Sequence, residues 1–154
     1  MASVRVGAKA PKFTLPTTAG EFRMAAPRDT RLVIYFYPRD NTPGCTLEGA
    51  DFRDLATQFR RAQTVILGVS TDTIESHHRF RDKMKFPFEL GSDEDHAVAS
   101  LFGVWKQKNM YGRKLMGIER STFLVDAQGV LRAEWRKVRV AGHAAQVLAA
   151  ARGL

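Results

Sequence analysis

Two continuous apolar runs, LVIYFYP at residues 32–38 and VILGVS at residues 65–70, most constrain the fold of this chain. Neither run alternates apolar with polar residues, so each is expected to form a strand that is buried on both faces of a sheet. Between them, apolar residues recur from Phe52 to Phe59 at the i, i+3, i+4 and i+7 positions of a helix. A buried strand, a helix and a second buried strand indicate a layered α/β domain.

The remaining segments continue this alternation of strands and helices. In chain order they predict a hairpin over residues 13–24, a polar surface helix over 74–85, a strand leading into a turn over 86–95, an amphipathic helix that begins at Val98 and stops soon after Gly103 or Trp105, a hairpin over 120–138 that turns at 127–129, and a closing helix over 144–151. Because the sequence has no repeat, low-complexity segment or linker, one domain is expected over residues 1–154. The order of elements is compatible with a thioredoxin-like sheet but does not prove one.

The formal net charge of +8 raises the question of a nucleic-acid partner. Residues 1–100 contain 14 Lys and Arg against 13 Asp and Glu, whereas residues 101–154 contain 10 against 3. The basic residues of this last third are spread among strand and loop patterns and do not form one block. A solvated basic face is the leading interpretation, and binding of nucleic acid or another anionic partner is the alternative.

No membrane segment or secretory signal is expected. The longest apolar runs are far shorter than the roughly 20 residues that span a bilayer, and the N-terminal MASVRVGAKAPKF lacks the apolar region of a signal peptide. Cys45 is the only cysteine, which excludes an intramolecular disulfide. These features favour a reducing, cytoplasmic setting without membrane contact.

Cys45 lies in TPGC, where the first buried strand should give way to a helix. Thr42 is a favoured N-cap residue and Pro43 suits the first helical position, which places Cys45 in the first turn. There the unpaired amide groups and the positive end of the helix dipole favour a thiolate, the reactive form of cysteine. A buried structural thiol is the competing interpretation, and local context by itself leaves both open.

The stretch PRDNTPGC, which contains Pro38, Thr42 and Cys45, carries the PxxxTxxC signature of peroxiredoxins. The wider segments YFYPRDNTPGCTLEGADFRDL, GVSTD, SDEDHAVASLFGVW and GIERSTFLVDAQGVL resemble the peroxiredoxin Q subfamily, also called bacterioferritin comigratory protein. The resemblance runs in the expected order from about Gly7 through Val140. It implies an α/β, thioredoxin-like fold with a central mixed β-sheet flanked by helices and an N-terminal β-hairpin. It also implies an antioxidant thiol peroxidase that reduces hydrogen peroxide and organic hydroperoxides.

The resemblance further implies a role for each matching residue. Cys45 would be the nucleophile that becomes a sulfenic acid. Thr42 would position the peroxide, Pro38 would shield the pocket, and Arg120 of the GIERSTF segment would stabilise the thiolate and the leaving oxygen. Each has a simpler alternative, because Thr42 could only cap the helix, Pro38 could only end a strand and Arg120 could lie on the surface. Glu48 is interpreted as a carboxylate in the first helical turn and not as a catalytic residue.

No cofactor or metal site is expected. His77 and His78 are adjacent, so in a helix they point about 100° apart and are poor joint ligands. His96 and His143 are isolated in the sequence, and the acidic turn at residues 93–95 lacks the pattern of an EF-hand loop. Trp105 and Trp135 are expected to pack against other residues and not to stack on bases.

The sequence departs from the family at the resolving cysteine. Many peroxiredoxin Q members carry a second cysteine five residues after the first, where this chain has Ala50, and others carry it on a later helix. A one-cysteine mechanism is therefore predicted, in which an external thiol from the thioredoxin, glutaredoxin or glutathione system reduces the sulfenic acid. A monomer is expected by analogy with the subfamily. The alternatives are a redox sensor or partner-binding module that uses Cys45 oxidation, and an anion- or nucleic-acid-binding protein.

Overall fold

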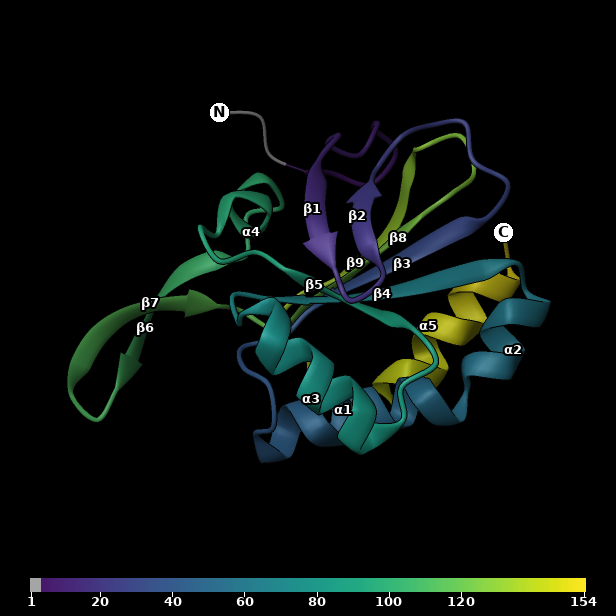
Figure 1. The fold of residues 1–154 in the computed structure, drawn as a ribbon. Coiled ribbons are helices and arrows are strands. Elements are labelled where there is room, and N and C mark those ends of the chain that lie inside the picture. The colour runs from purple at the N-terminus through teal and green to yellow at the C-terminus, as the bar shows by residue number, and fades with distance from the viewer. Residues whose placement is uncertain (1–3) are drawn as a thin grey trace.

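The computed structural model describes residues 4–154, in which seven strands form one mixed sheet (Figure 1). The strands lie in the order β2-β1-β5-β4-β3-β8-β9. The inner strands β3 to β5 pair in parallel, whereas β8, β9 and the N-terminal hairpin β1–β2 pair antiparallel. The bounds are β1 Thr14–Thr17, β2 Gly20–Arg23, β3 Arg31–Phe36, β4 Thr64–Ser70, β5 Glu89–Ser92, β8 Ser121–Val125 and β9 Leu131–Trp135. The predicted mixed sheet and the predicted N-terminal hairpin are confirmed.

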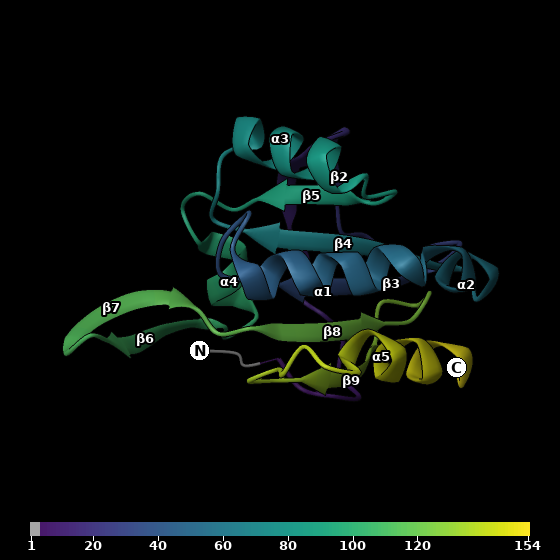
Figure 2. The same cartoon turned by 90° about the horizontal axis from the view of Figure 1, so that it is seen from below.

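The longer helices gather on one face of this sheet (Figure 2). The helices are α1 Pro43–Asp54, α2 Ala56–Arg61, α3 Ile74–Met84, α4 Ala97–Leu101 and α5 His143–Arg152. Figure 1 shows α1, α2, α3 and α5 below the central strands of the sheet, with α4 and the β1–β2 hairpin, which forms one edge of the sheet, above those strands. No helix among residues 4–154 is long and apolar enough to cross a membrane.

Strand β3 explains why its sequence is apolar without interruption. Its residues alternate between two hydrophobic clusters, with Val33 and Tyr35 facing the layer of α1, α3 and α5. Ile34 and Phe36 face the layer of β1 and α4. All four are at most 1% exposed, so both faces of this central strand are buried, as the pattern predicted.

The structure corrects two helices. The helix predicted through residues 52–59 is divided at Leu55, whose φ of −102° and ψ of 3° end α1 and precede α2. The helix predicted from Val98 to a stop soon after Gly103 or Trp105 ends at Leu101, nearer to the first of these stops, and Trp105 begins a strand. The glycine at Gly103 adopts a φ of +68°, which ends that helical segment early.

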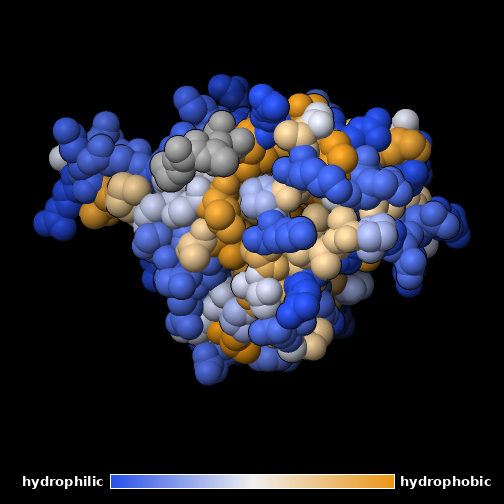
Figure 3. All heavy atoms as spheres, turned by 90° about the horizontal axis from the view of Figure 1, so that it is seen from above, coloured by the Kyte–Doolittle hydropathy of each residue, from blue (hydrophilic) through white to orange (hydrophobic). Residues whose placement is uncertain are grey.

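A hairpin formed by β6 (Trp105–Met110) and β7 (Arg113–Ile118) was not predicted. Residues 106–117 are mostly polar and lack the alternation that indicates a half-buried strand. The available sequence signal was Gly112, because a two-residue hairpin turn favours glycine. In the structure Tyr111 and Gly112 form this turn, with positive φ angles of 54° and 77°. The hairpin projects from the body of the molecule, and its surface is largely hydrophilic (Figures 1 and 3).

Candidate active site

Cys45 is buried at the start of α1, on the helical layer of the sheet. It is the third residue of the helix and is 2% exposed. The first helical hydrogen bond runs from Thr46 N–H to Thr42 O at 2.8 Å, so the amide groups of residues 44 and 45 lie before the helical ladder. The unpaired amide groups at the start of α1 therefore lie beside Cys45 and are suited to bind an anion.

Thr42 occupies the N-cap position, but its side chain does not cap the helix. Its Oγ1 instead donates a hydrogen bond to Arg39 O at 2.9 Å, within the loop that joins β3 to α1. The Thr42 hydroxyl is therefore not used as a helix cap. Pro38 opens the same loop and is half-buried beside the fully buried end of β3.

Arg120 lies next to Cys45 although 75 residues separate them in the sequence. Strand β8 pairs antiparallel with β3, and this register sets Ser121 opposite Phe36. Arg120, one residue earlier, therefore reaches the end of β3 where the Cys45 loop begins. Its Nη2 lies 3.5 Å from Cys45 Sγ. Burial lowers the pKa of Arg120, but the neighbouring Glu48 and Cys45 outweigh burial and raise that pKa above its ordinary value.

Glu48 completes this cluster and was missed as a site residue. It follows Cys45 by three positions, so both side chains lie on one face of α1, and it occupies the second helical turn and not the first. Its Oε1 accepts from Arg120 Nη1 at 2.5 Å, and its side chain is 1% exposed. Its Oε2 is buried and has no hydrogen-bond partner among the described residues. The i, i+3 spacing was the signal that could have identified it.

Burial controls the charge of Glu48. Desolvation raises the pKa of this carboxyl from 4.5 to about 7, against the opposing effect of Arg120. Glu48 therefore exchanges a proton near neutral pH, which makes it a group able to give or take a proton beside the thiol. Lys108 of β6 belongs to the same environment, since burial and then Arg120 lower the pKa of its ammonium while Cys45 raises it.

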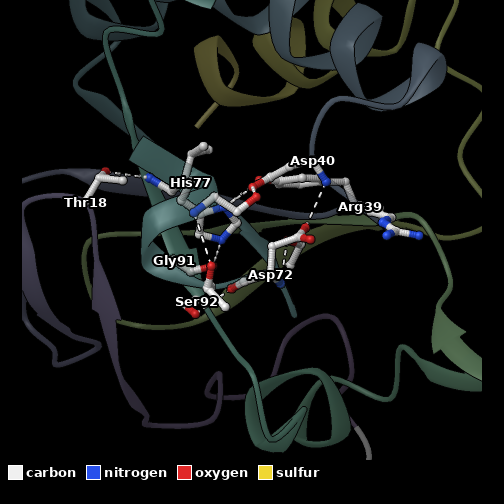
Figure 4. A network of polar contacts seen from close by, with 12 residues as sticks. Thr18, Arg39, Asp40, Asp72, His77, Gly91 and Ser92 are labelled. Atoms are coloured by element: carbon white, nitrogen blue, oxygen red, sulfur yellow. Dashed lines mark hydrogen bonds and ion pairs between the residues drawn. The ribbon is translucent and has the colours of Figure 1, made fainter. Parts of the chain in front are cut away.

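The loop between β3 and α1 is fixed by Asp40, whose carboxylate contacts helix α3 (Figure 4). Asp40 Oδ2 lies 2.7 Å from His77 Nδ1. His77 is fully buried, although α3 is otherwise the polar surface helix that the sequence predicted. His143 is also buried, and burial followed by Arg120 lowers its pKa to about 4, so it is neutral and pairs with Thr122 Oγ1 at 2.7 Å.

Asp40, Asp72 and His77 lie close enough to be examined as metal ligands, with one possible ligand atom from each within 4.8 Å of the others. Both ring nitrogens of His77 are already within hydrogen-bond distance of protein oxygens, Asp40 Oδ2 at 2.7 Å and Gly91 O at 2.8 Å. No ring nitrogen remains for a metal ion, and the cluster is better described as a hydrogen-bond network.

An apolar cavity of about 380 Å³ lies apart from Cys45, between the β1–β2 hairpin, β4 and α2. It is lined by Phe22, Val65 and Phe88 among others, and none of the four predicted site residues lines it. The titratable side chains of Glu48 and Arg120 instead lie together at Cys45. The start of α1, and not this cavity, is therefore the candidate active site.

Comparison with known proteins places the chain among peroxide-reducing enzymes. The family model described as AhpC/TSA family matches residues 6–134. Peroxiredoxin Bcp of Bacillus subtilis is 46% identical over 147 residues, which cover 95% of this chain and 94% of that protein. Peroxiredoxin Bcp of Xanthomonas campestris is 56% identical over 119 residues, which cover 77% of this chain and 74% of that protein.

Solved structures agree with these sequence relatives. Xanthomonas campestris peroxiredoxin Q superposes with a TM-score of 0.86 at 49% identity, covering 92% of this chain and 90% of that one. The bacterioferritin comigratory protein of the same organism, studied for its alkyl peroxide reduction activity, superposes with a TM-score of 0.89 at 45% identity over 97% of this chain and 98% of that one. With this fold and this likeness over nearly its whole length, the chain belongs to the AhpC/TSA family, as a peroxiredoxin of the peroxiredoxin Q (bacterioferritin comigratory protein) subfamily that contains a single cysteine.

Proposed function

We propose that this chain is a thiol-dependent peroxidase that reduces hydrogen peroxide and organic hydroperoxides through Cys45. The observation that carries the proposal is the position of Arg120 Nη2, 3.5 Å from a buried cysteine sulfur at a helix N-terminus. A structural thiol has no need of a cation held beside it by a second buried charge. The trapped intermediate and ligand complexes of the Xanthomonas relative, which concern alkyl peroxide reduction, support the same class of substrate.

In the first half-reaction, the Cys45 thiolate attacks the terminal oxygen of a hydroperoxide. A sulfur–oxygen bond forms, the oxygen–oxygen bond breaks, and the leaving alkoxide takes a proton to become an alcohol or water. Arg120 stabilises the thiolate and the charge that develops on the leaving oxygen. Glu48, whose pKa burial raises to about 7, is suited to supply the proton, and its Oε2 has no hydrogen-bond partner among the described residues.

Thr42 and Pro38 have supporting roles in this proposal. The Thr42 hydroxyl is not engaged in a helix cap, so it can turn from Arg39 O toward a bound peroxide and donate to it. Pro38 lacks an N–H group and covers the approach to the thiol from the β3 side. Both residues lie on the loop that carries Cys45.

The second half-reaction requires a thiol from outside, because the sequence contains no other cysteine. An external thiol attacks the sulfenic sulfur, a mixed disulfide forms and water leaves; a second thiol then releases the Cys45 thiolate and a disulfide of the reductant. We propose a reductant from the thioredoxin, glutaredoxin or glutathione system. An unpaired reactive thiol suits a reducing compartment, which supports a cytoplasmic location.

We further propose that residues 1–154 act as one domain and as a monomer. Two hydrophobic clusters on the two faces of a single sheet support the single domain, and the subfamily likeness supports the monomer. The basic residues of the last third do not form a nucleic-acid surface in this proposal. Several have structural partners, including Arg120 with Glu48, Arg132 with Asp126, and Arg136 with Phe102 O and Gly103 O.

The test is rapid mixing of the reduced protein with hydrogen peroxide, followed by tryptophan fluorescence and by trapping of the sulfenic acid. We expect fast, stoichiometric labelling of Cys45 that is absent in Cys45→Ser. Turnover with glutathione or a protein dithiol should then consume one peroxide per reductant disulfide formed. Reaction at the rate of an ordinary free thiol would exclude the peroxidase, whereas fast oxidation without turnover would favour the redox sensor.

A further inference from the structure

The loop that carries Cys45 is held to helix α3 by two residues, the buried Asp40 (Figure 4) and the exposed Asn41, whose Oδ1 accepts from Lys83 Nζ at 2.7 Å. Asp40 lies two positions before the N-cap Thr42 and is 8% exposed. Its carboxylate accepts hydrogen bonds from Tyr37 Oη at 2.6 Å and from Ser76 Oγ at 2.8 Å. Its Oδ2 also contacts His77 Nδ1 at 2.7 Å. Thus Tyr37, directly after β3, and helix α3 are joined to each other through this one carboxylate.

The proton positions follow from the partners of His77. Gly91 O can only accept a hydrogen bond, so His77 Nε2 carries a proton and donates it over 2.8 Å. The opposite nitrogen, Nδ1, lies 2.7 Å from Asp40 Oδ2, a distance that requires one proton between the two atoms. Whether nitrogen or oxygen holds that proton, the pair has no net charge, which allows both groups to be buried.

The backbone of Asp40 is held separately from its side chain. Its N–H donates to Asp72 Oδ2 at 2.8 Å, and Ser70 Oγ donates to the same oxygen at 2.6 Å. Ser92 Oγ in turn donates to Asp72 O at 2.6 Å. The far ends of β4 and β5 are therefore fixed to the loop as well. Removing the Asp40 side chain leaves this backbone contact, so the two attachments can be tested independently.

The reaction cycle needs this loop to be closed in one step and open in another. Peroxide is small and reacts with Cys45 in its pocket, where Arg120 is 3.5 Å from the sulfur. A thiol reductant is larger and must approach the sulfenic sulfur directly, yet Cys45 is only 2% exposed. With no second cysteine in the chain, reduction therefore requires the loop and the first turn of α1 to move.

We propose that Asp40 and His77 form a clasp that holds the Cys45 loop closed. This clasp determines what fraction of the Cys45 sulfenic acid reacts with a second peroxide and what fraction reacts with an external thiol. While the clasp is closed, the sulfenic acid stays beside Arg120 and can react with another hydroperoxide, which transfers one oxygen to sulfur and leaves as alcohol or water. The product is a sulfinic acid. When the clasp opens, the external thiol reaches the sulfur, forms a mixed disulfide and releases water. Asp40 and His77 are positioning residues, because they contact neither the sulfur nor the substrate.

The clasp gives opposite effects on the two half-reactions, and this separates it from a purely structural role. The test compares Asp40→Ala/His77→Leu with the wild-type chain; the double change leaves no unpaired buried charge. His78→Leu on the same helix is the matched control, because His78 is exposed. Asp40→Asn is the conservative variant, since an amide retains hydrogen bonds to Tyr37 and His77.

Three quantities are measured: the rate of oxidation by hydrogen peroxide, the rate of sulfenic acid reduction by glutathione, and the fraction of Cys45 that gains two oxygens by intact mass. In the double variant, oxidation by hydrogen peroxide should slow and the fraction of sulfinic acid should fall. Reduction of the sulfenic acid should accelerate by about tenfold, the order expected for loss of a charge-assisted hydrogen bond. Asp40→Asn should lie between the double variant and the wild type, and His78→Leu should match the wild type.

Reduction that is unchanged, or that slows together with oxidation, in both Asp40→Asn and the double variant would overturn the clasp. If the double variant does not fold, Asp40→Asn alone decides the question, because it preserves the shape of the side chain. The inference rests on the proposed peroxidase cycle, but its failure is distinguishable. A wild-type Cys45 that reacts slowly with peroxide refutes the cycle, whereas fast oxidation with no shift among the variants refutes only the clasp.

Discussion

Glu48→Gln should remove a pH-dependent loss of stability that the active site imposes on the wild-type protein. Glu48 is 1% exposed, and burial raises the pKa of its carboxyl from 4.5 to about 7 even beside Arg120. The folded protein therefore binds this proton more tightly than the unfolded chain does. Stability falls as the pH rises from 4.5 to about 7 and is constant above that range.

The size of this effect follows from the same two values. The interval between 4.5 and about 7 corresponds to roughly 3 kcal/mol, since each tenfold change in proton affinity is about 1.4 kcal/mol. Glutamine keeps a carbonyl oxygen that accepts from Arg120 but cannot ionise. The free energy of unfolding of Glu48→Gln, relative to wild type, should therefore increase by up to roughly 3 kcal/mol between about pH 4.5 and pH 8.

Urea unfolding at several pH values across this range, followed by tryptophan fluorescence, measures that difference. Replacing the neutral carboxyl by an amide shifts the stability of the variant by an amount that does not depend on pH, so the slope with pH carries the information. Glu75→Gln on the exposed side of α3 is the matched control. A difference between Glu48→Gln and wild type that stays constant with pH would refute the assignment of a raised pKa to Glu48.

Three further substitutions test the site and its packing. Arg120→Met should slow the peroxide reaction by about 100-fold to 1,000-fold in rapid mixing, which is the usual effect of removing a donor to developing negative charge. Adding Glu48→Gln to this variant should recover stability in urea but not the reaction rate. A recovered rate would contradict the role of Arg120. Thr42→Val should cost about 1 kcal/mol or less in urea, because its hydroxyl does not cap α1, while the peroxide reaction slows by a larger factor; an unchanged rate would remove Thr42 from the site. Gly49→Ala should lower the free energy of unfolding by about 1–3 kcal/mol, since a Cβ at this helical position would enter the ring of Phe86, and a stability equal to wild type would show that the ring can move aside.

Much of the fold could be predicted because the relevant signals are local. The apolar run of β3 indicated burial on two faces, and the glycine-containing turns indicated the hairpins β1–β2 and β8–β9. The β6–β7 hairpin was missed because it projects from the sheet and its strands have no buried face to impose an apolar alternation. The short α4 was overextended because Trp105 matched the helical spacing but belongs to β6.

The site was predicted to the extent that motif and helix start defined it. TPGC placed Cys45 in the first turn of α1, and resemblance to the family supplied Arg120, which no local pattern connects to the thiol. Glu48 and His77 were read as ordinary helical side chains, since their sequence context is the same whether they face solvent or the interior. Their burial depends on what packs against them, which is Arg120 for one and the Asp40 loop for the other.

By itself, the sequence determined most of the elements, the single thiol and its place at a helix N-terminus, because hydrophobic periodicity, capping preferences and residue counts act over a few neighbouring positions. Only the tertiary structure decided the electrostatics of that thiol. The antiparallel register of β8 on β3 brings Arg120 to Cys45, and exclusion of water around Glu48 raises the pKa of its carboxyl. Both effects arise between residues far apart in the chain, because strand register and the exclusion of water exist only after the chain has folded.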